Sequence, residues 1–200
     1  QAWPGTVAEL DPVPDHGERS WTGHGRLIGV RALVTGADSG IGRAIALAFA
    51  EAGADVAICH LGDTGMATTL VQAVTARGRR GFQMEADVAS VAAVRGFAAA
   101  AEVALGPCDI LVNNAGMNIR GPFESVTEED YDRVLDVHVK GMVFMAQAVY
   151  PGMVARGHGA ILNVSSVTAL TAMGTYAAHK AWVRTFTEGL VSELRGTGVT

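Results

Sequence analysis

Short apolar runs alternate along this chain with longer stretches in which apolar residues recur at helical spacing. Five runs have the length and composition of buried strands, at residues 31–35, 55–59, 81–85, 109–112 and 160–164. Helical patterns cover residues 41–52, 66–77, 90–105, 127–153 and 175–195. Ser90 and Thr127 stand where helix N-caps are expected, and Val199-Thr200 resembles the opening of another strand.

Alternating strands and helices of this kind predict an α/β fold with a doubly wound parallel sheet. Right-handed crossovers place helices on both faces, so we expect three layers, α/β/α. We assign residues 27–200 to this domain and residues 1–26, which are polar and contain Pro4, Pro12 and Pro14, to an N-terminal extension. Because the chain stops where a sixth strand would open, we expect the domain to lack its last strands.

Composition excludes several classes of partner. The chain is 49% hydrophobic and 18% charged, as in globular proteins, and its net charge of -5 argues against a nucleic-acid partner. We recognise neither a membrane span nor a signal peptide, and we expect a cytoplasmic protein. Cys59 and Cys108 flank strands that a third should separate, which is too far for a disulfide, so both are expected as reduced thiols. The histidines show no metal-ligand spacing, and no metal site is expected.

Glycines cluster where the first predicted strand meets the first predicted helix. Residues 35–42 read TGADSGIG, with the spacing TGxxxGxG. Glycine accepts unusual backbone angles and lets the main chain approach a pyrophosphate, while the helix N-terminus adds unpaired N–H groups. The segment predicts a dinucleotide site made by Gly36, Ser39, Gly40, Ile41 and Gly42.

Two further motifs follow in order. Asp87-Val88 comes after the third predicted strand, and Asn113-Asn114-Ala115-Gly116 after the fourth. With TGADSGIG, they resemble the motifs of the short-chain dehydrogenase/reductase family over about residues 27–200, and residues 17–29 loosely resemble the arm of a subgroup with an N-terminal extension. The resemblance implies a Rossmann fold and a nicotinamide dinucleotide, with cofactor contacts from Asp87, Val88, Asn114, Ala115 and Gly116.

The choice between NAD and NADP depends on the end of the second strand. A carboxylate there would hold both ribose hydroxyls of NAD and repel a 2′-phosphate. The family position falls on His60, so NAD loses its usual anchor, yet no Arg stands nearby to pair a phosphate. Asp63 is an alternative partner for the ribose. We slightly favour NADP and keep NAD open.

Tyr176 and Lys180 lie four residues apart, on one face of the last predicted helix. Carbonyl reduction needs a proton donor at the substrate oxygen, and a nearby ammonium favours the phenolate needed in the reverse direction. The resemblance makes Tyr176 the acid/base, Lys180 its activator and a ligand of the nicotinamide ribose, and Ser166 the residue that positions the reacting oxygen. Ser165 is expected to be structural, and His179 to face solvent or the cofactor edge.

One position departs from the family pattern. Where the family carries an Asn that holds a water on the path between the lysine and solvent, this chain has His138. A neutral imidazole both donates and accepts, so we predict that His138 belongs to a proton relay. A protonated ring would repel Lys180, and a helix residue without any catalytic part is the alternative.

These residues predict an NAD(P)-dependent oxidoreductase acting on a small carbonyl or alcohol substrate. A non-catalytic dinucleotide-binding sensor or scaffold is the alternative, and an epimerase or dehydratase of the same superfamily is less favoured because its glycine spacing usually differs. The resemblance implies a homodimer or homotetramer paired through the helices that begin near Thr127 and Thr175. Apolar residues at helical spacing there, some of which core packing also explains, are Val143, Phe144, Ala148, Trp182, Val183 and Phe186.

Overall fold

A computed structural model describes residues 11–12, 15, 20–119, 121–171 and 174–200. Its five strands form one sheet in the order β3-β2-β1-β4-β5, and every neighbouring pair is parallel. The strands are β1 (Arg31–Thr35), β2 (Asp55–His60), β3 (Gly81–Glu85), β4 (Ile110–Asn113) and β5 (Ala160–Asn163). The strand order reverses beside β1, and ligands of open α/β sheets bind at such a reversal, beyond the carboxyl ends of the strands.

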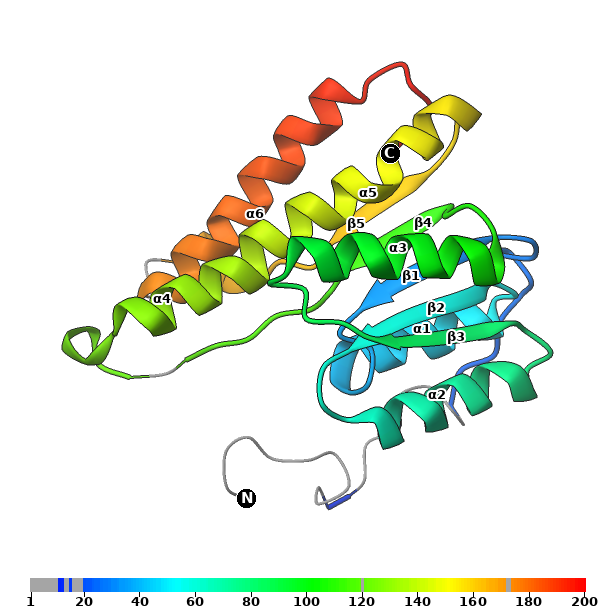
Figure 1. Ribbon diagram of the computed structural model, residues 1–200, viewed down its shortest axis with the longest axis horizontal. Helices are drawn as coiled ribbons and strands as arrows, with labels where there is room; N and C mark the ends of the chain where they lie inside the picture. The colour runs from blue at the N-terminus through cyan, green and yellow to red at the C-terminus, as the bar shows by residue number, and fades with distance from the viewer. Residues whose placement is uncertain (1–10, 13–14, 16–19, 120, 172–173) are drawn as a thin grey trace.

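Helices cover both faces of the sheet (Figure 1). Helices α1 (Gly40–Glu51) and α2 (Thr64–Ala76) pack on one face. Helices α3 (Val91–Leu105) and α5 (Gly141–Arg156) pack on the other, with α6 (Gly174–Glu193) beyond them. The predicted doubly wound, three-layer fold is confirmed.

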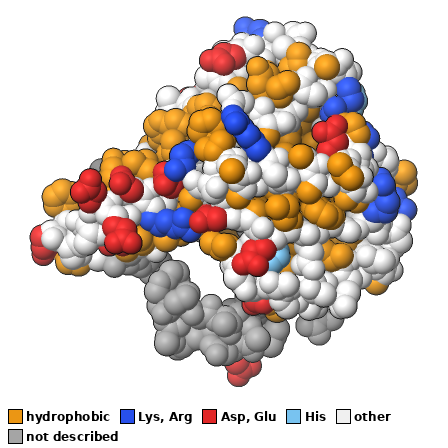
Figure 2. Space-filling view, in the orientation of Figure 1, with side chains coloured by type: hydrophobic (Ala, Val, Ile, Leu, Met, Phe, Trp, Pro, Cys, Tyr) orange, Lys and Arg blue, Asp and Glu red, His pale blue; other side chains and the backbone are white. Residues whose placement is uncertain are grey.

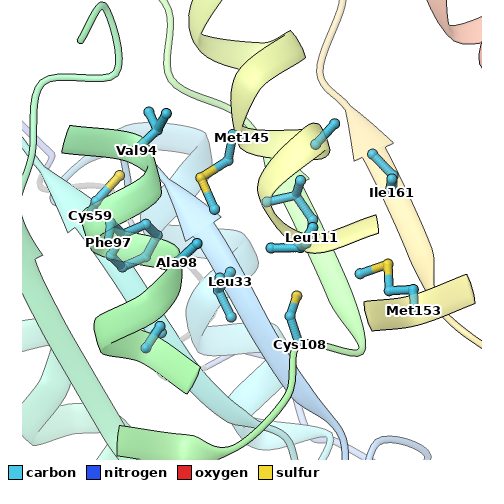
Figure 3. Packing of buried hydrophobic residues seen from close by; sticks show 14 of the residues in the cluster. Leu33, Cys59, Val94, Phe97, Ala98, Cys108, Leu111, Met145, Met153 and Ile161 are labelled. Carbon is cyan, nitrogen blue, oxygen red and sulfur yellow. The ribbon is translucent and has the colours of Figure 1, made fainter. Parts of the chain in front are cut away.

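The strands feed two separate cores because successive side chains of a strand point to opposite faces. In β2, Val56 and Ile58 join the core under α1 and α2, whereas Ala57 and Cys59 join the core under α3 and α5. Figure 3 shows the second core, with Phe97 of α3 among the buried side chains. Strands buried on both faces explain why the sequence shows continuous apolar runs there.

Side chains cap the helices where the sequence predicts. Ser90 Oγ accepts a hydrogen bond from Ala93 N at 3.3 Å, and Thr127 Oγ1 accepts one from Asp130 N at 3.1 Å. We predicted one continuous helix over residues 127–153. The structure instead has α4 (Glu128–Leu135), a π-helical turn (Asp136–Lys140) and α5 in succession. Such π-turns are rare and concentrate at functional sites.

Both cysteines lie in the interior of the protein. Cys59 and Cys108 are free and buried, and burial raises the pKa of both thiols to about 12, so they stay protonated.

Val199 forms a parallel bridge with Gly159, beside β5, where the next strand was expected. No helix among the described residues has the length and apolar character to cross a membrane. Most of residues 1–19 lie outside the described part, so the division at residue 26 stays a prediction.

Candidate active site

Two glycines give the turn between β1 and α1 its backbone conformation. Gly36 has φ +61° and Gly40 has φ +52°, in the left-handed region that disfavours other residues. A Cβ on Gly36 would lie 2.9 Å from Ala115 Cα, whereas a Cβ on Gly40 would meet nothing within 4 Å. Gly36 therefore lets two loops touch, and Gly40 leaves room for a ligand above the start of α1.

Thr35 and Asn114 tie this turn to the loop after β4. Thr35 Oγ1 accepts hydrogen bonds from Asn114 N and Ala115 N, both at 3.0 Å. The Asn114 amide group donates in return to Thr35 O at 3.0 Å and to Gly36 O at 2.9 Å. Asn114 thus positions the turn through its side chain. The sequence analysis did not single out Thr35, although it opens the TGxxxGxG motif.

A cleft of about 640 Å³ lies beyond the carboxyl ends of β1 to β4. Its walls come from the loops after these strands and from α4, which explains why motifs far apart in the sequence meet there. Most of the predicted cofactor residues line it, namely Gly36, Ser39, Gly40, Ile41, His60, Asp87, Val88, Asn114, Ala115 and Gly116. The volume falls in the range of small-molecule and cofactor sites.

Gly42 lies beneath this cleft and is absent from its lining. A Cβ there would come within 2.3 Å of Gly36 O and 2.5 Å of Asn114 Nδ2. The position therefore needs glycine so that α1 can pack against the turn and the Asn114 side chain. This is a packing role, and the cofactor contact that we predicted for Gly42 stays a prediction.

In the part of the cleft formed by the loop after β3, Asp87 is held by two partners. Its carboxylate accepts from Ala89 N at 2.9 Å and from Arg133 Nη1 at 2.8 Å. Burial alone would raise the pKa of Asp87, but these hydrogen bonds and the charge of Arg133 outweigh it and lower that pKa. Sequence reasoning missed Arg133, since its contact joins α4 to the loop after β3.

The end of β2 differs from the expectation in one respect. Asp63, proposed as a ribose partner, is instead the N-cap of α2, where Oδ1 accepts from Met66 N at 2.9 Å. Asp38, from the glycine turn, lines the cleft with His60, and burial raises its pKa. His60 is 2% exposed, and its Nδ1 has no hydrogen-bond partner among the described residues.

Beyond the cleft, α6 carries the predicted catalytic pair. Lys180 is 5% exposed, and its Nζ donates to Val164 O at 2.9 Å and lies 5.9 Å from the centre of the Tyr176 ring. Burial lowers the pKa of Lys180 to about 8, which leaves the amine charged at neutral pH. Ser165 Oγ donates to Lys180 O at 2.8 Å, an arrangement consistent with its expected structural role.

Ser166 stands at the start of the 3-10 helix η4 (Val167–Leu170). Its Oγ accepts hydrogen bonds from Thr168 N at 3.2 Å and from Thr168 Oγ1 at 2.9 Å. Both contacts use the oxygen as an acceptor, so the hydroxyl hydrogen can be donated to a ligand. Residues 172–173 of the following loop lie outside the described residues.

His138 lies in the π-turn and is 3% exposed. Its Nε2 is 3.1 Å from Met117 N and 2.5 Å from Met117 O, so one tautomer accepts from the N–H and the other donates to the carbonyl. The ring meets the Tyr176 ring edge-on, with centroids 5.8 Å apart. Burial, followed by the nearby charges of Lys180 and His179, lowers the pKa of His138 to about 4 despite the bond to Met117. His138 is therefore neutral at pH 7.

A small cavity of about 10 Å³ connects these groups. Its lining includes His138, Lys180 and Asn113, and it shares Val88 and Ala115 with the large cleft. The volume suits about one water molecule. Lys180 of the predicted catalytic pair thus lies close to the large cleft, separated from it by the shared residues Val88 and Ala115.

His179 departs from its predicted place. We expected it to face solvent or the cofactor edge, but it is 6% exposed and its ring lies 5.7 Å from the Tyr131 ring of α4. Val183, considered for a subunit interface, is only 2% exposed and belongs to the interior. A helix viewed alone could not reveal that α4 covers these positions.

Comparison with known proteins agrees with this geometry. The short chain dehydrogenase family matches residues 31–200, and the chain belongs to that family. A short chain dehydrogenase of Pseudocercospora fijiensis is 40% identical over 181 residues, which cover 88% of this chain and 58% of that protein. The uncharacterized oxidoreductase YghA of Escherichia coli is 33% identical over 204 residues, covering 100% of this chain and 69% of YghA.

Solved structures agree as well. The blue fluorescent protein from a metagenomic library, crystallised with NADPH, superposes with a TM-score of 0.82 at 40% identity, covering 88% of this chain and 72% of that one. This chain spans only 58% of the length of the Pseudocercospora relative. The family and the fold are established by these matches, and the roles of individual residues remain predictions.

Proposed function

We propose that this protein is an NAD(P)-dependent oxidoreductase that transfers a hydride between a nicotinamide dinucleotide and a small carbonyl or alcohol substrate. The proposal rests above all on the shared wall between the dinucleotide cleft and the cavity at Lys180. That adjacency brings a dinucleotide motif and a Tyr/Lys pair, separated by more than a hundred residues, to one place.

The residues of the cleft fit a dinucleotide. Gly40 leaves open space at the start of α1, and Ser39 there makes no capping hydrogen bond with its side chain, so its hydroxyl can bind a phosphate. Gly36, Ile41, Asn114, Ala115, Gly116, Asp87 and Val88 complete the proposed contacts. The bound cofactor supplies the hydride, and the protein supplies binding, orientation and the proton.

We favour NADP over NAD, as in the NADPH-bound metagenomic relative. His60 at the end of β2 carries no carboxylate that would repel a 2′-phosphate. Asp38 is a further carboxyl group in the cleft, and burial raises its pKa. Dissociation constants for NADPH and NADH, measured by fluorescence, decide the preference.

In the proposed reaction, Tyr176 gives a proton to the carbonyl oxygen during reduction and takes it back during oxidation. Ser166 donates its free hydroxyl hydrogen to that oxygen and orients it. The ammonium of Lys180, held by Val164 O, stabilises the phenolate form of the tyrosine. We propose that neutral His138 relays protons between Lys180 and solvent. Its Nε2 accepts a hydrogen bond from Met117 N in one tautomer and donates one to Met117 O in the other.

Replacing Tyr176 by Phe tests the proposal. We expect NADPH or NADH oxidation with a panel of ketones to fall by about 100-fold or more, since general acid catalysis contributes about that much. Tyr150→Phe on α5, at a side chain 37% exposed, is the matched control and should keep full activity. Undiminished turnover in Tyr176→Phe would refute the assignment. Dinucleotide binding without turnover in the wild type would favour the sensor or scaffold instead.

We also propose a homo-oligomer and a cytoplasmic location. Of the apolar residues predicted at an interface, Trp182 is 39% exposed on α6 and stacks on Phe186, with ring centroids 5.0 Å apart. A stacked aromatic pair at the surface is typical of an interface. Light scattering coupled to size-exclusion chromatography measures the number of subunits, and Trp182→Glu should reduce it.

A further inference from the structure

The large cleft has two carboxyl groups in its lining, those of Asp38 and Asp87. Asp87 is already held, by Ala89 N and by Arg133. Asp38, from the turn between β1 and α1, is half-buried and forms no ion pair with any residue that the structure describes. A carboxylate in a cleft proposed for phosphate-bearing ligands repels part of them, since like charges repel.

The charge of the whole protein does not compensate for this repulsion. The chain carries a net charge of -5, and Figure 2 shows acidic side chains gathered at the projecting end that contains α4. The binding of an anionic dinucleotide therefore depends on the groups inside the cleft, and Asp38 is one of its few charged side chains.

Hydrogen bonds fasten the glycine turn to the end of β2. Gly36 N and Ala37 N both donate to Cys59 O, at 2.9 Å and 3.3 Å. Asp38 is the next residue of the turn, and its carboxyl group is close enough to His60 for the charge of the imidazole to affect the pKa of Asp38. The turn thus places a carboxyl group beside the end of β2 from a neighbouring segment.

The topology of the sheet indicates which part of a dinucleotide reaches this place. In doubly wound sheets the pyrophosphate binds at the start of the first helix, and the ribose of the adenosine half binds at the end of the second strand. Here these places are the open space above Gly40 and the end of β2. His60 ends β2, but its side chain is 2% exposed and offers a ligand almost no surface. The other charged residues of the lining come from the loop after β3 and from α4, which leaves Asp38 as the charged group at this ribose.

We propose that Asp38 contacts the 2′ position of the adenosine ribose and determines how strongly this protein distinguishes NADP from NAD. The inference rests on the proposed function, in which the cleft binds a nicotinamide dinucleotide. The Asp38 carboxylate accepts a hydrogen bond from the 2′-hydroxyl of NAD and repels the 2′-phosphate of NADP. The glycine turn thus supplies the carboxylate that β2 lacks, and Asp38 limits the preference for NADP.

Asp38→Asn tests this role because it removes the charge and keeps the shape of the side chain. Dissociation constants for NADPH and NADH are measured at about pH 8, which favours the carboxylate, from the fluorescence of the bound nicotinamide. We expect the variant to bind NADPH about tenfold more tightly than the wild type, since the repulsion is gone. NADH should bind about threefold more weakly, because an amide is a poorer acceptor than a carboxylate. The ratio of the two constants then changes by about 30-fold.

Nucleotide fragments separate the ribose from the rest of the cofactor. Adenosine 2′,5′-bisphosphate carries the 2′-phosphate and 5′-AMP carries the 2′-hydroxyl, and neither contains nicotinamide. Measured by competition with NADPH, the bisphosphate should bind Asp38→Asn about tenfold more tightly than the wild type. The affinity for 5′-AMP should change in the opposite direction, by about threefold.

Two further variants serve as controls. Asp63→Asn removes a nearby carboxylate that caps α2 and lies outside the cleft lining, and Asn is itself a good N-cap. It should change the ratio of the two dissociation constants by less than about twofold. Asp38→Glu keeps the charge, so it should not strengthen NADPH binding. Circular dichroism checks that all three variants remain folded.

Two outcomes would overturn the role of Asp38. One is an unchanged ratio in Asp38→Asn, or a change of the same size in Asp63→Asn. The other is tighter binding of both dinucleotides to Asp38→Asn, which would indicate repulsion of the pyrophosphate that they share. If the wild type bound neither dinucleotide, the proposed function would fail together with this inference. Binding of both without turnover would contradict only the proposed reaction, since the ratio could still be measured.

Discussion

The glycine turn after β1 lines the large cleft, and the π-turn and α6 line the small cavity beside it, but the two regions hold their functional groups in different ways. The turn uses backbone atoms and close packing, with Gly36 and Gly42 in contact with the loop after β4. The π-turn and α6 instead bury titratable side chains, since His138, His179 and Lys180 are all at most 6% exposed. The first region should therefore be sensitive to added volume, and the second to pH.

The largest expected effect follows from adding volume beneath the turn. Gly42→Val places a branched side chain where even a Cβ would lie 2.3 Å from Gly36 O. We expect a loss of about 3 kcal/mol in the free energy of unfolding, in the upper range for overpacked sites, together with loss of dinucleotide binding. Urea unfolding and cofactor fluorescence measure the two effects.

Gly189→Ala in α6 is the matched control. A Cβ at this helical glycine would meet nothing within 4 Å, so alanine should be neutral or raise stability by up to about 1 kcal/mol. If Gly42→Val unfolded no more readily than the control, the close packing described here would be wrong.

A smaller effect is expected from pH at His138. Its pKa is about 4 in the folded protein against 6.5 ordinarily, so the unfolded chain binds more protons between these values. The contribution of His138 to the free energy of unfolding is therefore complete above about pH 6.5 and is lost as the pH falls towards 4. Relative to His138→Asn, the wild type should lose about 2 kcal/mol between pH 7.5 and pH 5. Urea unfolding at each pH measures this difference, and a difference that stays constant would contradict it.

The same position tests the relay. His138→Asn should preserve turnover near neutral pH, because an amide also donates and accepts hydrogen bonds. His138→Ala should lower the rate or shift the pH profile. An unchanged rate and profile in the alanine variant would leave His138 with a packing role alone.

The smallest effect concerns the ion pair between α4 and the loop after β3. Arg133 of α4 and Asp87 after β3 are 36% and 34% exposed, so solvent screens their attraction. A double-mutant cycle with Arg133→Gln and Asp87→Asn should give a coupling energy of about 0.5 kcal/mol, and Arg133→Gln should raise the pKa of Asp87. A coupling energy of zero with an unchanged Asp87 signal in ¹³C NMR would show that the pair contributes nothing.

Much of the fold was predictable because it depends on local pattern. The five strands were predicted within one or two residues, and Ser90 and Thr127 cap the helices as expected. The cofactor motifs were predictable for the same reason, since the carboxyl ends of parallel strands meet at one edge. Most of their residues do line one cleft.

The differences from the prediction come partly from local boundaries and partly from contacts between segments distant in the sequence. Asp63 was proposed as an alternative ribose partner. The helix α2 begins at Thr64 and not at residue 66 as predicted, so Asp63 is its N-cap. His179 was expected to face solvent or the cofactor edge, yet it is buried with its ring near the Tyr131 ring of α4. The π-turn around His138 has no signature in the residue pattern, because a helix with one extra residue in a turn still buries the same kinds of side chain.

The sequence by itself determined the doubly wound fold, the family and the order of the motifs. The reason is that the periodic spacing of apolar residues and the spacing of glycines set the local structure within a few residues. Only the tertiary structure decided which side chains are dehydrated. The neutral state of His138 and the lowered pKa values of Lys180 and His179 all follow from burial. Burial depends on which helix covers a residue, and that is settled only when α4, α5 and α6 pack together on the sheet.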